Sequence, residues 1–127
     1  MLVSAFPPNP QGEANYAGLY WRELCRQRSN WRFHVVSQTT EAVASDSAPC
    51  TVARVMHEKG IRRHFNWFRV LREAARFRPD VVHVQSALYP DYGGIFGELL
   101  LLALAPLRLL GVSIVVAMHS TWMRDDV

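Results

Sequence analysis

A proline followed by a valine-rich run, within residues 78–86, is the feature that most constrains how this chain folds. Pro79 lacks a backbone donor and disfavours a helical conformation in the residue before it, so the preceding helical pattern should end at Phe77. Three valines then form a β-branched run, which is typical of a strand covered on both faces. Polar residues follow from Gln85, where an open α/β sheet places its ligand crevice. We therefore expect an interior strand that leads into a functional site.

The length and composition indicate one folded domain spanning residues 1–127. Half of the residues are hydrophobic and 20% are charged, which argues against disorder. The formal net charge is +3, and Lys59 is the only lysine. Arginine presents a planar fork of donors that matches phosphate and carboxylate, so the balance favours anionic partners.

Two cysteines, Cys25 and Cys50, form no CxxC pair and have no histidine at ligand spacing. We interpret both as free thiols in a reducing compartment, with a disulfide as the alternative. The N-terminus has neither a basic segment nor an apolar stretch long enough for a signal peptide. The expected location is the cytoplasm.

Strand and helix patterns alternate along the chain. Besides the central strand, strands are expected over residues 2–6, 31–37, 51–55 and 112–118, and helices over residues 16–28, 61–77 and 95–110. Arg54 interrupts the third strand, which places it nearer an edge of the sheet. The alternation predicts an α/β fold, a Rossmann-like parallel sheet with helices on both faces.

The segment over residues 61–77 gives the clearest helical pattern. Its apolar residues follow one face, which we expect to be the buried stripe: Ile61, Phe65, Phe68, Leu71 and Ala75. Arginines occupy much of the remaining surface, which is either an ordinary solvated face or one that engages an acidic membrane or a phosphorylated acceptor. Nucleic acid is not the expected partner, because the aromatic residues lie mostly on the stripe assigned to the core.

The helix over residues 95–110 should be kinked by Pro106 and capped by Gly111. A membrane anchor over residues 99–118 is the competing interpretation. It fails because Pro106, Arg108 and Gly111 interrupt the run of about 20 apolar residues that a span requires.

Most of the histidines give no sign of chemistry, because none has the paired spacing of a metal site. We therefore expect no metal and no cofactor. His83 lies between two valines, so we expect it to be buried and hydrogen-bonded in the floor of the cleft. His119 directly follows the last strand, at the carboxyl edge where strand ends line the crevice, and is the candidate functional histidine.

Gly12 lies before the first helix, in a loop that either points N–H groups at an anion or is simply a tight turn.

Three motifs resemble the N-terminal half of a glycosyltransferase family 4 enzyme, which has the GT-B fold. They are Phe6-Pro7-Pro8 followed by Gly12, then Arg78-Pro79-Asp80-Val81-Val82-His83-Val84-Gln85, which is similar to the family's "PDVVHVH" strand, and Val115-Val116-Ala117-Met118-His119, which is similar to its "VVVTxH" strand end. The resemblance spans essentially the whole chain.

The resemblance implies one of two Rossmann-like domains that face each other across a cleft. The N-terminal domain mainly holds the acceptor, and a C-terminal domain binds the nucleotide of the sugar donor. Such hexosyltransferases retain anomeric configuration and need no metal. By resemblance, His119 is the catalytic residue and contacts the transferred sugar, and Gly12 lies near the donor phosphates. The substrate-binding residues expected at the same crevice are Gly12, Glu13, Gln85, Ser86, Tyr92 and Ser120.

The expected function is therefore sugar transfer from a nucleotide-sugar donor to a lipid-linked or polysaccharide acceptor. Residues 1–127 carry no donor-binding motif, so we expect a partner domain or subunit to supply one and the chain alone to be inactive. Peripheral contact with the inner membrane face through residues 61–77 is a further expectation. The alternative is a non-catalytic Rossmann-like module that binds a phosphorylated ligand or a partner protein.

Overall fold

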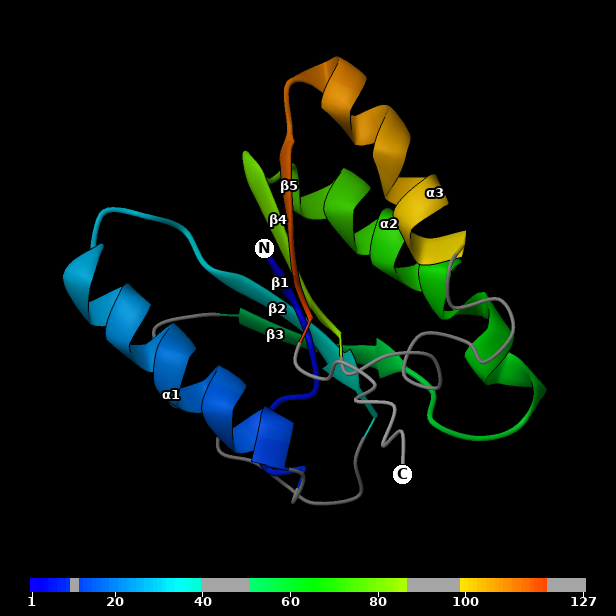
Figure 1. Ribbon diagram of the computed structural model, residues 1–127, viewed down its shortest axis with the longest axis horizontal. Coiled ribbons are helices and arrows are strands. Elements are labelled where there is room, and N and C mark those ends of the chain that lie inside the picture. The colour runs from blue at the N-terminus through cyan, green and yellow to red at the C-terminus, as the bar shows by residue number, and fades with distance from the viewer. Residues whose placement is uncertain (10–11, 40–50, 87–98, 119–127) are drawn as a thin grey trace, which may run out of the picture.

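The computed structural model describes residues 1–9, 12–39, 51–86 and 99–118 (Figure 1). Its strands are β1 (Leu2–Val3), β2 (His34–Gln38), β3 (Thr51–Met56), β4 (Val81–Ser86) and β5 (Ser113–Met118). Its α-helices are α1 (Gly12–Gln27), α2 (Asn66–Phe77) and α3 (Leu99–Leu104), and two 3₁₀ helices are η1 (Ile61–Phe65) and η3 (Ala105–Leu110). Helices and strands alternate through most of this order, which confirms the predicted α/β class.

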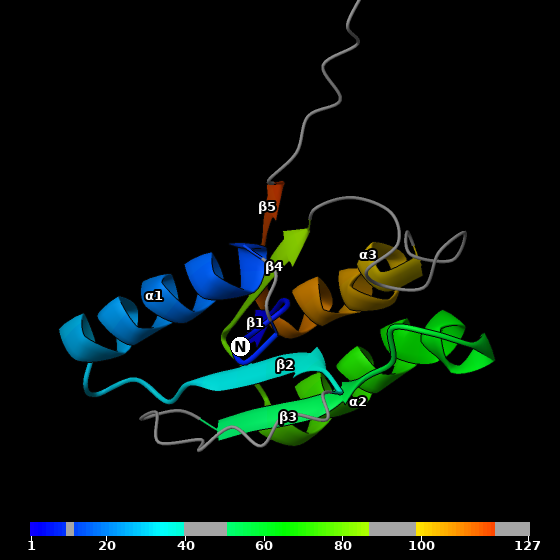
Figure 2. The ribbon, with the colours of Figure 1, turned by 90° about the horizontal axis from the view of Figure 1, so that it is seen from below.

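The five strands form one parallel sheet in the order β3-β2-β1-β4-β5. Helix α1 covers one face of the sheet, and α2 and α3 lie together on the other (Figure 2). This arrangement confirms a Rossmann-like sheet with helices on both faces. Strand β3 lies at one edge, as we expected from the charged Arg54 within it, and β5 lies at the other.

The short strand β1 organises two hydrophobic cores, because successive residues of a strand point to opposite faces. Leu2 points toward α1, and Val3 points toward α2 and α3. The core under α1 comprises Leu2, Phe6, Ala17, Trp21, Cys25, Phe33 and Val35. The core under α2 and α3 includes Val3, Val36, Met56, Val70, Val82, Val84, Leu100 and Leu104. Cys50 lies outside the described residues.

Strand β4 is interior, but its α1-side face is covered only toward the carboxyl end, where Gln85 is buried. Val82 and Val84 are buried under α2 and α3, whereas Val81 is 42% exposed on the other face. The prediction of cover on both faces is therefore wrong at the amino end of the α1 side, where Val81 is exposed. The reason is that α1 packs over β1 and β2, and no other helix of the described residues lies on that face.

The segment over residues 61–77 differs most from its prediction. It is a 3₁₀ turn, η1, that continues as α2, and the buried residues of α2 are Asn66, Val70, Glu73 and Ala74. The expected buried stripe is wrong, since Ile61, Phe65 and Phe68 are exposed.

A buried polar side chain explains why α2 turns a different side toward the core from the one predicted. The side-chain amide of Asn66 donates to the backbone carbonyl of His57 and accepts from its N–H, both at 2.9 Å. These two bonds satisfy the buried amide, so Asn66 can lie in the core while more apolar neighbours turn outward.

The helices end close to the proline and glycine residues from which their ends were predicted. Helix α2 ends at Phe77 as predicted, and Arg78 closes it in the left-handed region at φ 53°, with its N–H donating to the Ala74 carbonyl at 2.8 Å. Gly111 caps η3 at φ 83°, as expected. The expected helix over residues 95–110 is split into α3 and η3 near Pro106, and residues 95–98 lie outside the described ranges. Among the helices that can be described, none is long and apolar enough to cross a membrane.

Candidate functional site

The carboxyl ends of β1 and β4 meet at the switch point of the sheet, because the connections from these neighbouring strands lead in opposite directions. Ser4 directly follows β1, and its hydroxyl donates to Oε1 of Gln85 at 3.1 Å. Both side chains are buried. Gln85 therefore lies at the edge where the sequence placed it, and its part in binding a substrate stays a prediction.

The loop between β1 and α1 is held by residues in and after β3. A guanidinium nitrogen of Arg54 donates to the carbonyl of Pro7 at 2.6 Å, and the amide of Asn9 donates to the Glu58 carboxylate at 3.1 Å. Helix α1 packs closely on the same loop, since a Cβ on Gly18 would lie 2.7 Å from Cγ of Pro7. These contacts fix where α1 begins relative to the carboxyl edge.

Helix α1 begins at Gly12, so the expected anion-facing residue is the first of the helix rather than part of a separate turn. The first N–H groups of a helix have no partner within it, and the helix dipole is positive at this end. The first turn of α1 can therefore favour an anion at the carboxyl edge.

Two buried polar atoms at the end of β2 were not anticipated from the sequence. They are Oγ of Ser37 and Oε1 of Gln38, which have no hydrogen-bond partner among the described residues. Buried polar atoms of this kind call for an explanation such as water, an ion or a functional role. The sequence does contain a sign of polar groups at this edge of the sheet. A serine lies at or next to the carboxyl end of three strands, β1, β2 and β4: Ser4, Ser37 and Ser86.

The other predicted site residues are placed only in part. Glu13 is the second residue of α1, and Ser86 is the last of β4, so both belong to elements that meet the carboxyl edge. Tyr92, His119 and Ser120 lie outside the described residues. The roles predicted for all of these residues remain predictions.

His34 lies at the start of β2 in a polar cluster under α2. Its Nδ1 is 2.6 Å from the Thr51 hydroxyl, its Nε2 is 3.4 Å from the Glu73 carboxylate, and its ring stacks on Phe77 at 4.9 Å. Burial lowers the pKa of His34, and the nearby Glu73 carboxylate opposes that shift only in part. The imidazole is therefore neutral at pH 7, and the cluster joins β2, β3 and α2.

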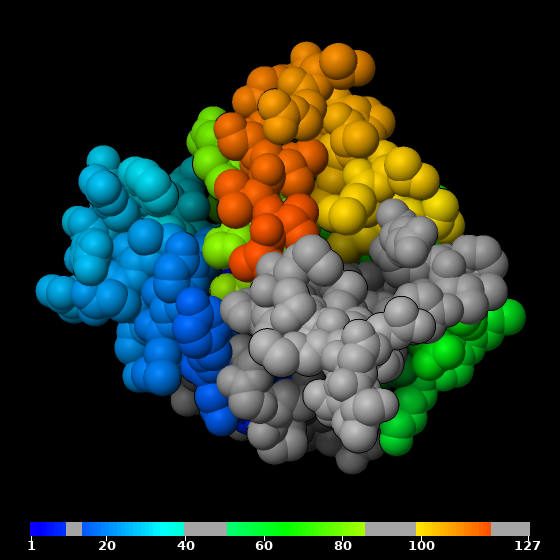
Figure 3. Space-filling model, viewed as in Figure 1, coloured from blue at the N-terminus to red at the C-terminus, as the bar shows by residue number. Residues whose placement is uncertain are grey.

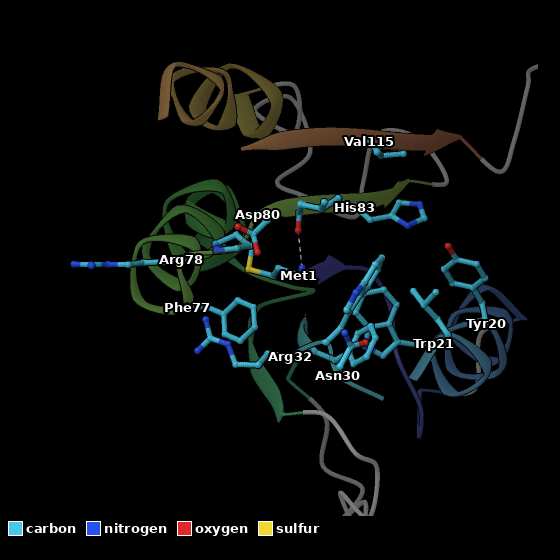
Figure 4. A pocket seen from close by; sticks show the side chains of 15 residues that line it. Met1, Tyr20, Trp21, Asn30, Arg32, Phe77, Arg78, Asp80, His83 and Val115 are labelled. Carbon is cyan, nitrogen blue, oxygen red and sulfur yellow. Dashed lines mark hydrogen bonds between the residues drawn. The ribbon is translucent and has the colours of Figure 1, made fainter. Parts of the chain in front are cut away.

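His83 does not occupy the buried position expected for it. Its side chain lies on the α1 side of β4, where it is half-buried and meets the Tyr20 ring edge-on, with centroids 5.8 Å apart. Figure 4 shows both rings at one wall of a hollow between α1 and the sheet.

This hollow, the α1-side pocket, has a volume of about 720 Å³, within the range of small-molecule sites. Figure 3 shows part of β4 visible between α1 and β5. The lining is largely apolar and aromatic: Tyr20, Trp21, Leu24, Trp31, Phe33, Phe77, Val81, His83 and Val115. The pocket opens because the sheet lacks a second covering helix there among the described residues.

The charged groups of the α1-side pocket do not converge on its centre. The guanidinium of Arg32 lies over the Phe77 ring at 5.4 Å, and the Arg78 side chain points away from the hollow (Figure 4). The α-amino group of Met1 donates to the Val81 carbonyl at 2.6 Å. The pocket also lies toward the amino ends of the strands, so it is separate from the carboxyl edge at which the sequence placed the site.

In the part of the chain that the structure describes, no three His, Cys, Asp or Glu side chains gather as metal ligands.

No family model, curated protein or solved structure matches this chain. The candidate site therefore rests on the geometry of the chain itself.

Proposed function

We propose that this chain is the N-terminal, acceptor-side domain of a retaining glycosyltransferase of the GT-B type. Its substrates would be a nucleotide-sugar donor and a lipid-linked or polysaccharide acceptor. The observation that carries the proposal is the buried Ser4–Gln85 pair at the switch point of the sheet, beside the end of the strand that resembles the family motif. Open α/β sheets bind their ligands at this point.

Such a domain would orient the two reactants and stabilise the charge that develops during sugar transfer. A departing nucleoside diphosphate carries growing negative charge, which the first turn of α1 can favour through its N–H groups and dipole. His119 is proposed to contact the transferred sugar, and the polar strand ends to hold the reactants in place. A second domain would bind the nucleotide base and exclude water.

The proposal is tested by titrating the ¹⁵N-labelled 127-residue chain with uridine diphosphate and with guanosine diphosphate. We expect the amide signals of Ser4, Gly12 and Gln85 to shift, while that of Leu104, in the core behind the sheet, stays unchanged. Gln85→Met removes the polar amide at similar volume and should weaken binding about ten-fold, as expected for a lost hydrogen bond to a charged ligand.

The matched control is Asn30→Ala, which changes a polar residue of the α1-side pocket and should leave diphosphate affinity unchanged. Thermal unfolding of both variants checks that the fold is retained. If neither diphosphate shifts any signal at the carboxyl edge, the transferase assignment loses its main support.

A second candidate function is a non-catalytic module that binds a phosphorylated ligand or a partner protein, and the largely apolar lining of the α1-side pocket favours the partner protein. The same titration separates the two functions. Trp21 and Trp31 line this pocket, so shifts confined to their indole N–H signals would favour the binding module over the transferase.

A further inference from the structure

The outer surface formed by η1 and the start of α2 exposes three large apolar side chains. Ile61 is 76% exposed, and Phe65 and Phe68 are each 52% exposed. They point outward because the bonds between Asn66 and His57 turn the opposite side of α2 into the core. We call Ile61, Phe65, Phe68, Arg62, Arg69 and Arg72 the η1–α2 outer surface.

The apolar side chains of this surface lie among arginines. A guanidinium nitrogen of Arg69 donates to the Arg62 carbonyl at 2.8 Å, which joins η1 to α2. Burial, and then the neighbouring charges of Arg62 and Arg72, lower the pKa of Arg69, so the three guanidinium groups share one electrostatic environment.

The nearby carboxylates do not neutralise these arginines. Neither η1 nor the first turn of α2 contains an acidic residue. Glu73 is buried and lies 3.2 Å from Arg76 and 3.4 Å from His34, and Glu58 accepts a hydrogen bond from Asn9 at 3.1 Å. The η1–α2 outer surface is therefore both apolar and positively charged.

We propose that the η1–α2 outer surface binds an anionic lipid bilayer. Ile61, Phe65 and Phe68 enter the headgroup region, and the arginines lie at the level of the lipid phosphates. The exposed rings of Phe65 and Phe68 remove the reason against a nucleic acid that was drawn from the sequence. The most exposed apolar side chain of the surface, Ile61, is nevertheless aliphatic, so it gains from contact with acyl chains and not from stacking on a base, which favours the bilayer over RNA.

This inference goes beyond the proposed glycosyl transfer and stands whether or not that function holds. Its geometry is nevertheless compatible with a membrane-borne ligand. Segment η1 comes after β3 and lies toward the end of the molecule where the strands end (Figure 1). A bilayer at this surface would lie on the same side of the molecule as the carboxyl edge.

The test is co-sedimentation of the full 127-residue chain with lipid vesicles. One set contains phosphatidylcholine alone, and the other contains phosphatidylcholine mixed with phosphatidylglycerol. We expect binding to the anionic vesicles and little to the neutral ones. Replacing both phenylalanines, as Phe65→Ser with Phe68→Ser, should lower the partition coefficient by about ten-fold or more. Arg62→Gln and Arg72→Gln should each lower it about five-fold.

Matched controls come from the exposed side of α1, on the other face of the sheet. Leu19 is 65% exposed and Arg22 is exposed, so Leu19→Ser and Arg22→Gln make the same kinds of change away from the η1–α2 outer surface. Both should bind the anionic vesicles like the unchanged chain, and thermal unfolding confirms that each variant is folded.

Three results would overturn the proposal. The first is equal binding to neutral and anionic vesicles, and the second is an equal loss of binding in the control variants. The third is binding to polyuridylate RNA, sensitive to the phenylalanine and arginine variants, without binding to vesicles.

Discussion

One row of residues across the sheet shows how differently its two halves are covered. The register aligns Val35, Leu2, His83 and Val115 on the face that carries α1. Val35 and Leu2 are fully buried, His83 is half-buried, and Val115 is 48% exposed. The row thus passes from a closed half, β2 and β1, to an open half, β4 and β5.

The difference teaches that position in a sheet and burial are separate properties. Strand β4 is interior by its pairing with β1 and β5, yet its α1-side face remains open at Val81, because α1 packs mainly over the closed half and meets β4 only at His83. The closed half supplies stability, whereas the open half has surface available for a ligand or another chain. Free energies of unfolding can measure this contrast.

The largest expected effect is in the closed half of the row. Leu2→Ala should lower the free energy of unfolding by about 2–5 kcal/mol, because it removes a fully buried side chain and leaves a cavity between α1 and the sheet. Urea unfolding measures the change. Val115→Ala, in the open half, should change the same free energy by no more than about 0.5 kcal/mol. A comparable loss in both variants would mean that the α1-side face of β5 is covered in solution.

The next effect concerns the close approach of α1 to the loop after β1. Gly18→Ala places a methyl group 2.7 Å from Cγ of Pro7, so either the helix or the loop must move. We expect a loss of about 1–3 kcal/mol in the free energy of unfolding. Asn15→Ala, on the exposed side of the same helix, should be neutral or slightly stabilising through helix propensity. A neutral Gly18→Ala would show that the contact with Pro7 is not maintained.

The smallest effect is a dependence of stability on pH in the closed half. Burial lowers the folded-state pKa of His34 below its ordinary value of about 6.5. Between those two pKa values the unfolded chain binds more protons, so the free energy of unfolding should fall as the pH drops below about 6.5.

Urea unfolding at neutral and mildly acidic pH measures this slope, and His34→Gln should reduce it. The slope should not vanish, because burial also lowers the pKa of the Met1 α-amino group to about 6, and burial, and then Arg69 and Arg62, lower the pKa of His57. An unchanged slope in His34→Gln would show that His34 does not titrate differently in the folded and unfolded chain.

Local signals in the sequence were sufficient to predict the order of elements. Pro79 marks the end of α2, Gly111 caps η3, and valine-rich runs become the interior strands β2 and β4. These features act within a few residues of one another, so the α/β class could be predicted from the sequence alone.

The side of α2 that packs against the core could not be predicted in the same way. Asn66 and Glu73 are polar, so the apolar pattern assigned them to solvent, yet both are buried with partners in other segments. Asn66 bonds with His57, and Glu73 contacts His34 on β2. Helical periodicity contains no information about such distant partners.

The candidate site was predicted in outline. Gln85 lies at the carboxyl edge as expected, but its partner Ser4 and the buried polar atoms of Ser37 and Gln38 were overlooked. The exposure of Val81 on the α1 side of β4 was also overlooked, because a valine run gives no sign of which helix will cover which face.

The central place of β1 has a consequence for synthesis on the ribosome. Ser4 bonds with a residue 81 positions later, and β1 pairs on that side only with β4. The chain must therefore emerge beyond β4 before its first strand can be paired on both sides. Non-local pairings of this kind slow folding, since a long loop must close before they form. The earliest residues made are thus among the last to reach their final surroundings.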